Sequence, residues 1–275
     1  MSILRIFSRH SSHNVIRRKI NLPLLTVLRL GSTTKGQLPY KVEINTVEAI
    51  KNSASKLLMK QCFTKAGVKT PDWFIQSIKK DNSLVKVIGF DGEKPIVKIE
   101  DLQFPIVAKH HFGSRGTGNY LLKSQKELEK WMEGKDLSKY IFEKYYNYNR
   151  EYRIHITAEG CFYTCRKMLK SDTAKDKRWY RNDSNSSWIM ESNKAFDKPV
   201  NWQQIEAECI KALKAVGLDV AAFDVKVQSS KDKDGKELKT PDFIVIESNS
   251  APSFGEITTQ KYIEQIPKIF KTKTQ

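Results

Sequence analysis

Apolar positions recur along this 275-residue chain at two periods, one typical of helices and one typical of strands. Residues 47–66 carry apolar side chains three and four positions apart, which predicts an amphipathic helix that ends at Gly67. Residues 202–216 repeat this period and predict a second long helix, and residues 125–132 predict a shorter one.

Short apolar runs bounded by glycine, proline and asparagine predict strands. The expected strands cover residues 73–75, 84–90, 95–99, 104–109, 120–122, 140–145, 151–157, 162–169, 220–228 and 242–248. Turns at 91–92 and 159–160 and a loop around 234–235 join several of them into hairpins. Antiparallel hairpins with separate helices indicate an α+β fold rather than a doubly wound one. Residues 172–187 are polar and irregular, which predicts a mobile loop over a site.

Basic residues outnumber acidic ones, with 48 Lys and Arg against 31 Asp and Glu and a formal net charge of +17. A basic surface attracts nucleotides, nucleic acids or acidic protein segments, although lysine also serves solubility. Every apolar stretch is far shorter than the roughly 20 residues that a membrane-spanning helix needs. The four cysteines lack paired CxxC spacing, which argues against a zinc site and favours free thiols. We therefore expect a cytoplasmic protein without a membrane partner.

Residues 1–42 contain no Asp or Glu, and basic residues cluster between positions 5 and 19. This composition resembles an organellar transit peptide. The alternative is a basic arm or an edge strand on a cytosolic protein, and we favour it because presequences are rarely ordered. Residues 1–46 therefore form a basic N-terminal segment in the predicted organisation.

Lys109 closes an apolar strand and is followed by a glycine-rich loop, residues 113–118. A lysine at the end of a buried strand needs an anion nearby. Glycines let backbone N–H groups approach a phosphate closely, but glycine loops are also ordinary turns. The spacing matches neither a Walker P-loop nor a Rossmann turn.

Asp224, Glu247 and Asn249 interrupt two apolar runs that predict a hairpin. Glu247 and Asn249 are two residues apart, so both side chains point to one face of their strand. Two carboxylates and an amide oxygen form the oxygen-rich donor set that Mg²⁺ prefers. A solvated polar face is the alternative, and we favour the metal because buried, uncompensated carboxylates are costly.

Residues 143–146 end one predicted strand and residues 150–153 begin the next. A chain crossing between two lobes here would offer backbone groups to a nucleotide base and Glu151 to ribose hydroxyls. A surface salt-bridge ladder is the other interpretation, and the residues alone do not decide between them.

Taken together and in this order, the segments from about residue 45 to 254 resemble the ATP-grasp superfamily, in particular its carboxylate–amine ligases and peptide-modifying glutamate ligases. The resemblance rests on residues 52–56 before 67–71, on the strand lysine with its glycine loop, and on Glu247-Ser248-Asn249-Ser250-Ala251-Pro252. It implies two α+β lobes with ATP between them: residues 47–142 as the first lobe and 143–275 as the second, which carries the metal site.

The resemblance also implies a role for each matched residue. Contacts to ATP would come from Lys56, Lys109, Gly113, Ser114, Arg115, Gly116, Thr117, Gly118, Glu143, Lys144, Tyr145, Tyr146 and Glu151. Arg153, Arg166 and Arg181 would hold the γ-phosphate or an acyl phosphate. Asp224, Glu247 and Asn249 would bind Mg²⁺, with Mn²⁺ as the alternative ion.

Two departures from the family pattern affect the substrate. Ala222 stands where D-alanine–D-alanine ligase has an arginine, so a dipeptide cell-wall role is doubtful and Arg153 or Arg181 would substitute. Relatives also often carry a complete α/β domain before the grasp, and here only residues 1–46 are available to wall the acceptor site.

The implied activity is an ATP-dependent ligase that activates a carboxylate for attack by an amine or a thiol. The basic surplus favours an acidic peptide or a nucleic-acid-linked group as acceptor. Alternatives are a kinase that stops at phosphoryl transfer and an ATP-binding module associated with nucleic acid. Nucleotidyl-transferring ligases need a lysine in K-x-D-G, and Gly89 stands at that position in the nearest match.

Overall fold

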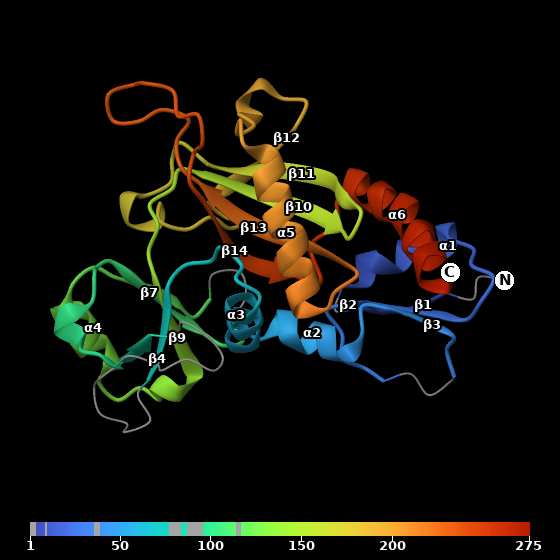
Figure 1. The fold of residues 1–275 in the computed structure, drawn as a ribbon, viewed down its shortest axis with the longest axis horizontal. Coiled ribbons are helices and arrows are strands. Elements are labelled where there is room, and N and C mark those ends of the chain that lie inside the picture. Colours follow the sequence, from blue (N-terminus) through green and yellow to red (C-terminus); the bar gives the residue numbers. More distant parts are fainter. Residues whose placement is uncertain (1–3, 9, 36–38, 77–83, 87–95, 114–116) are drawn as a thin grey trace.

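The computed structural model describes residues 4–8, 10–35, 39–76, 84–86, 96–113 and 117–275. These residues form three sheets with helices around them (Figure 1). Two of the sheets are mostly antiparallel and have helices packed beside them, which confirms the predicted α+β class.

The five-stranded sheet is antiparallel and has the strand order β12-β11-β10-β13-β14. Its strands are β10 (Arg150–Thr157), β11 (Gly160–Leu169), β12 (Ser186–Met190), β13 (Val220–Val227) and β14 (Phe243–Asn249). The predicted hairpins 151–157 with 162–169 and 220–228 with 242–248 are confirmed by the register. Residues 186 and 187 belong to β12, so the predicted irregular loop ends earlier than expected.

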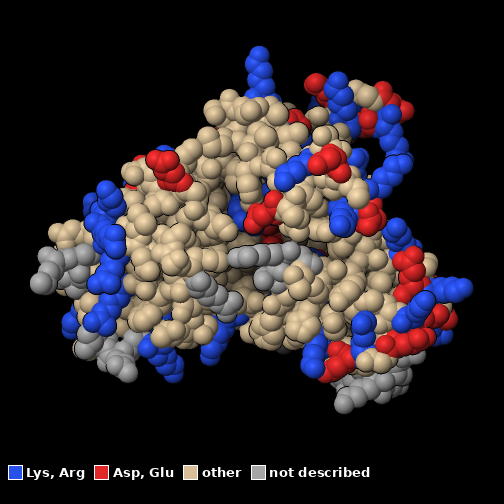
Figure 2. Space-filling view, turned by 180° about the vertical axis from the view of Figure 1, so that it is seen from behind, with Lys and Arg blue, Asp and Glu red and all other residues tan. Residues whose placement is uncertain are grey.

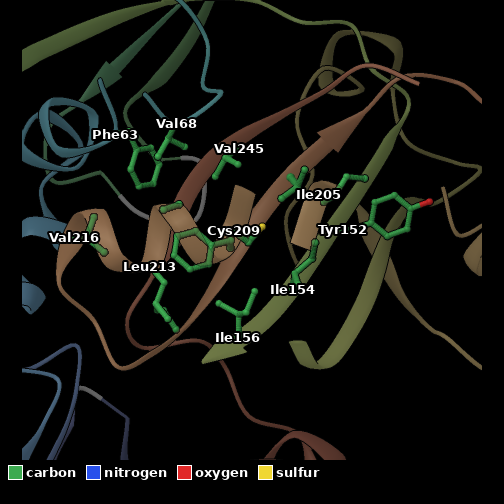
Figure 3. Packing of buried hydrophobic residues seen from close by; sticks show 14 of the residues in the cluster. Phe63, Val68, Tyr152, Ile154, Ile156, Ile205, Cys209, Leu213, Val216 and Val245 are labelled. Atoms are coloured by element: carbon green, nitrogen blue, oxygen red, sulfur yellow. The ribbon is translucent and has the colours of Figure 1, made fainter. Parts of the chain in front are cut away.

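One face of this sheet carries the largest core cluster (Figure 3). Alternation along β10 turns Tyr152, Ile154 and Ile156 toward that face, where they pack with α5 (Trp202–Val216). Each fully buried side chain of this size stabilises the fold by about 1.5–3 kcal/mol. The same alternation turns Glu151 and Arg153 to the opposite face.

The predicted helix 47–66 is divided in two: α2 (Val47–Ala54) and α3 (Lys56–Lys65). Ser55 interrupts it with extended backbone angles, φ −91° and ψ 118°, and its hydroxyl accepts a hydrogen bond from the Leu58 amide. A serine stabilises a helix start in this way, and the local hydroxyl bond competes with helix continuation. Both helices pack into the core of the five-stranded sheet.

The six-stranded sheet has the order β6-β5-β4-β9-β7-β8. Its strands are β4 (Trp73–Gln76), β5 (Leu84–Lys86), β6 (Ile96–Val97), β7 (Ile106–His110), β8 (Asn119–Leu122) and β9 (Tyr140–Lys144). The amphipathic helix α4 (Gln125–Met132) begins after the Ser124 cap, as predicted. The predicted turn at 91–92 lies outside the described residues, as do 87–90 and 95 of the strands beside it.

The basic N-terminal segment is a folded layer. It forms a parallel sheet of β1 (Leu4–Ser8), β2 (Thr26–Leu30) and β3 (Val42–Ile44), with β1 at an edge. Helix α1 (Asn14–Lys19) lies beside the C-terminal helix α6 (Glu256–Thr274) (Figure 1). Leu4 and Ile16 are buried in the core that this layer shares with α6. The remaining 3₁₀ turns are Ser11–His13, Ile99–Asp101, Leu137–Lys139, Lys175–Lys177 and Lys194–Phe196.

Among the described residues, no helix has the length and apolar character needed to cross a membrane.

Candidate functional site

A cleft of about 500 Å³ lies between the five-stranded and six-stranded sheets. Figure 2, which views the molecule from behind, shows basic and acidic side chains in a hollow at the middle of the view. His10 and Gly31 of the small N-terminal layer also line the cleft, so three parts of the chain meet around it.

Strand register arranges the cleft face of the five-stranded sheet into transverse rows of side chains. One row runs from β14 to β12 through Glu247, Asp224, Arg153, Cys165 and Met190. The next row runs from β13 to β12 through Lys226, Glu151, Lys167 and Trp188. These residues share a face because each is two positions, or one cross-strand pair, from the next.

Asp224 is the centre of a buried ion network on this face. Arg153 donates to both of its carboxylate oxygens, at 2.8 and 2.9 Å, and the Lys167 ammonium lies 2.6 Å from Oδ2. Lys167 also donates to Glu151 at 3.0 Å. Burial alone would raise the pKa of Asp224, but Arg153 and Lys167 outweigh it and hold this pKa well below its usual range. Asp224 is therefore ionised at neutral pH.

The predicted metal ligands meet at the end of this row. Asp224 lies directly opposite Glu247, and Asn249 follows two residues later on β14. The Asn249 amide nitrogen is buried without a hydrogen-bond partner among the described residues. A carboxylate has about four lone-pair positions, so Asp224 keeps one acceptor position beside its three cationic contacts. These oxygen donors are of the kind that Mg²⁺ prefers. In the described part of the chain, no group of three or more His, Cys, Asp or Glu side chains offers another metal site.

The six-stranded sheet and α3 form a second buried network of charged side chains beside the cleft. The Lys109 ammonium lies 2.7 Å from Glu143 on the neighbouring strand, and Lys60 of α3 lies 3.2 Å from the other oxygen of Glu143. Burial lowers the pKa of Lys60 to about 8. For Glu143, burial would raise the pKa, but Lys109 and Lys60 outweigh it and hold the pKa below its usual range. Two lysines against one carboxylate leave a net positive charge, and Lys109, which lines the cleft, presents it where it suits a phosphate.

Lys56 begins α3 and lies beside the glycine-rich loop. Its ammonium donates to the Gly113 carbonyl oxygen, and burial lowers its pKa. A Cβ at Gly113 would collide with the Thr117 carbonyl, so only glycine fits this close approach of the backbone. Gly118 has φ 77°, in the left-handed region. Ser114, Arg115 and Gly116 lie outside the described residues.

The predicted adenine-binding residues Lys144, Tyr145 and Tyr146 line the cleft where the chain passes from β9 to β10. The Tyr145 amide donates to Pro105 and the Lys144 amide to Asp72, which fixes this crossing. Apolar side chains also line the cleft: Met59 of α3, Pro71 of the loop before β4, Val107 of β7, and Ile244 and Ile246 of β14. Such walls suit a planar base.

Arg166 lies away from the cleft, which corrects its predicted role. It is next to Lys167 on β11, and alternation turns its guanidinium to the other face, where it donates to the Ala195 carbonyl and pairs with Asp197. Arg181 stays at the cleft rim, 2.8 Å from the Asn149 carbonyl and 3.5 Å from Glu151. The sequence did not predict a role for Lys60, Lys167 or Lys226. Lys167 could have been predicted, because it lies two residues after Cys165 on β11, and side chains two residues apart on a strand share a face.

No protein-family model and no curated protein sequence matches this chain. Solved structures do match it. D-alanine–D-alanine ligase from Bacillus anthracis is 15% identical, with 100% of this chain and 99% of that chain covered and a TM-score of 0.63. This is the ATP-grasp fold. The same ligase complexed with ATP gives 16% identity, coverage of 100% and 98%, and a TM-score of 0.61.

Biotin carboxylase from Campylobacter jejuni also has this fold. It is 18% identical to this chain, and the match covers 89% of this chain and 54% of that one, with a TM-score of 0.56. The chain thus spans about half the length of biotin carboxylase and nearly the full length of the D-alanine–D-alanine ligase. The predicted ATP-grasp architecture is confirmed.

Proposed function

We propose that this protein is an ATP-dependent carboxylate–amine (or carboxylate–thiol) ligase that works through an acyl phosphate. The observation that supports this most is a single cleft in which cationic side chains of both lobes face an oxygen-rich donor set. Lys109 comes from the six-stranded sheet, Lys56 from the start of α3, and Arg153 and Lys167 from the five-stranded sheet. Oxygen donors beside several cations suit a magnesium-bound polyphosphate better than a neutral ligand.

Each side chain has a role in this proposal. Lys56, Lys109 and the loop amides hold the phosphates, and residues 144–146 with the apolar walls hold the base. Glu151 faces the ribose end, although its present partners are Lys167 and Arg181. Asp224, Glu247 and Asn249 would hold Mg²⁺, which when bound would neutralise charge on the phosphates. Arg153 and Lys167 orient the γ-phosphate and the substrate carboxylate.

The chemistry balances without a protein nucleophile. A carboxylate oxygen of the substrate attacks the γ-phosphorus, and the bond between that phosphorus and the ADP oxygen breaks. The amine of the acceptor then attacks the acyl carbon, a C–N bond forms, and the C–O bond to phosphate breaks. The amine proton leaves to water and phosphate is released. Positioning and electrostatic stabilisation supply the catalysis, as is general for phosphoryl transfer.

The experiment that tests this proposal identifies the products formed from ATP with candidate carboxylates and amines, with mass spectrometry of the organic product. A ligase gives ADP, phosphate and a condensed product. A kinase gives ADP and a stable phosphorylated product, and a nucleotide-binding module gives no turnover.

The net charge of +17 supports an acidic or polymeric acceptor, such as an acidic peptide or a nucleic-acid-linked group. Residues 1–46 contain eight Lys or Arg and one Glu, and Figure 2 shows Lys and Arg side chains along the left end of that view, where the small sheet and α6 lie. The folded N-terminal layer contributes Gly31 and His10 to the cleft, so it would form part of the acceptor wall.

A further inference from the structure

The edge strand β12 of the five-stranded sheet exposes two large apolar side chains. Trp188 is 40% exposed and Met190 is 38% exposed, two residues apart on the edge strand β12. A large apolar side chain left in water forgoes its burial energy, so two of them together call for an explanation.

Register places both side chains on the face of the sheet that forms the cleft. Trp188 lies directly opposite Lys167, and Met190 lies directly opposite Cys165. Trp188 lines the cleft together with Arg153 and Lys167. Trp188 therefore lies beside the charged centre, one strand beyond the residues assigned to the γ-phosphate, and Met190 lies next to it on the same face, outside the residues that line the cleft.

The indole ring of Trp188 also lies against both cations. The Arg153 guanidinium carbon is 4.9 Å from its centroid, and the Lys167 ammonium is 5.3 Å from it. Cation–π contacts of this kind hold a ring in place. A ring that is held in place and still exposed is a prepared surface for a ligand group.

Arg153 pairs with Asp224, and Lys167 pairs with Asp224 and Glu151. In the proposed function the reacting carboxylate takes the donor positions that these two cations keep, so neither of them is left for a second acidic group over Trp188. An acidic group placed over Trp188 would lose hydration without gaining a free partner, whereas an apolar group would gain contact with indole and thioether.

We propose that Trp188 and Met190 form an apolar subsite for the carboxylate substrate, and that this substrate carries an aromatic or large aliphatic group close to its reacting carboxylate. The inference rests on the proposed ligase function and deepens it by naming the class of acyl donor. Trp188 is the specificity-determining residue, because it contacts the side group while Arg153 and Lys167 orient the reacting carboxylate.

The test measures binding of three N-acetyl amino acids to the full chain with Mg²⁺ and ADP by calorimetry. N-acetyl-L-phenylalanine is expected to bind at least tenfold more tightly than N-acetyl-L-glutamate, with N-acetyl-L-alanine between them. Trp188→Ala removes the preference for phenylalanine, so that the affinities for the phenylalanine and alanine compounds come within threefold of each other. Trp188→Phe keeps the preference, which separates a lost ring from a damaged fold.

Val200→Ala is the matched control, because Val200 is an apolar residue, 75% exposed, that does not line the cleft. It is expected to leave all three affinities unchanged. Equal or tighter binding of N-acetyl-L-glutamate, an undiminished preference in Trp188→Ala, or no binding of any of the three compounds overturns the subsite.

Adding ATP and hydroxylamine to the same mixtures separates the subsite from the ligase proposal, since an acyl phosphate is trapped as a hydroxamate. Binding preference without any hydroxamate keeps the subsite and removes the ligase proposal. Hydroxamate formed equally from the glutamate and phenylalanine compounds keeps the ligase and removes the subsite.

Discussion

Arg153 and Asp224 face each other directly across β10 and β13, and the guanidinium contacts both carboxylate oxygens. This pair joins the residues assigned to the phosphate with those assigned to the metal. Glu247 lies on the other side of Asp224 but has no ion pair within the described residues. The two carboxylates of the donor set therefore differ in what they do for the fold.

Glu247→Gln is expected to abolish turnover without lowering the melting temperature, because it removes a metal ligand and breaks no ion pair. Asp224→Asn is expected to abolish turnover and also to destabilise the fold by about 3–5 kcal/mol, because it leaves Arg153 and Lys167 buried without their shared partner. ADP release and denaturant unfolding of both variants check this. Wild-type ADP release from both variants would remove the metal assignment.

Neighbouring residues on β11 give a matched pair for the phosphate site. Lys167→Met is expected to lower kcat by about 100-fold or more, the usual cost of losing one donor to developing charge. Arg166→Met is expected to keep kcat within a few-fold and to lower stability, because its partners are on the far face of the sheet. Similar kcat losses in both variants would contradict the placement of the cleft on this face.

Much of the fold could be predicted from local patterns. Helix α5 and helix α4 have amphipathic periods with clear ends, and the hairpins β10–β11 and β13–β14 have alternating or apolar strands with turns between them. The break between α2 and α3 at Ser55 could not be predicted, because the apolar spacing continues through it. The hydrogen bond from the Leu58 amide to the Ser55 hydroxyl sets the backbone geometry there.

The small N-terminal sheet and α6 could not be predicted from the sequence either. The burial of Leu4 and Ile16 depends on contacts with α6, which is some 250 residues away along the chain. Within the site, the metal ligands and Lys109 stand out as polar residues in apolar runs. Lys60 does not stand out in the sequence, because its partner Glu143 belongs to another element and only tertiary packing brings the two together.

His13 gives the protein a pH dependence of stability. It is fully buried, its Nε2 lies 3.1 Å from the Pro252 carbonyl, and its ring packs on Phe254. Burial lowers its pKa from 6.5 to about 4. Between these values the unfolded chain binds the extra proton, so stability falls as the pH drops below 6.5.

His13→Gln is expected to remove this contribution. Wild-type stability should fall more steeply than that of the variant between pH 6.5 and 4.5, by on the order of 2 kcal/mol. Urea unfolding at several pH values measures the difference. Parallel pH profiles for the two proteins would mean that His13 titrates normally in the folded state.

The basic end of the molecule is expected to speed encounter with the acceptor. Arg17 and Arg18 are exposed on α1, and Lys268 and Lys271 are exposed on α6, the helix that α1 contacts. Arg17→Glu with Arg18→Glu should lower kcat/KM for an acidic acceptor and weaken its salt dependence. Point substitutions are required, because deleting residues 1–19 would remove the buried Leu4 and Ile16.

The control reverses the same amount of charge at Lys233 and Lys236, which are exposed in the loop between β13 and β14. That loop lies far from α1 (Figure 1), so these changes should leave kcat/KM nearly unchanged. Equal effects of the two double variants would show that overall charge, and not this surface, governs encounter.

The most direct measurement of the proposed function is the fate of ATP when the full chain is incubated with Mg²⁺, hydroxylamine and a library of carboxylates. The account predicts ADP and an equal amount of one or more hydroxamates, with both products lost in Glu247→Gln. Release of AMP and pyrophosphate, or of ADP with a stable phosphorylated product and no hydroxamate, would contradict it.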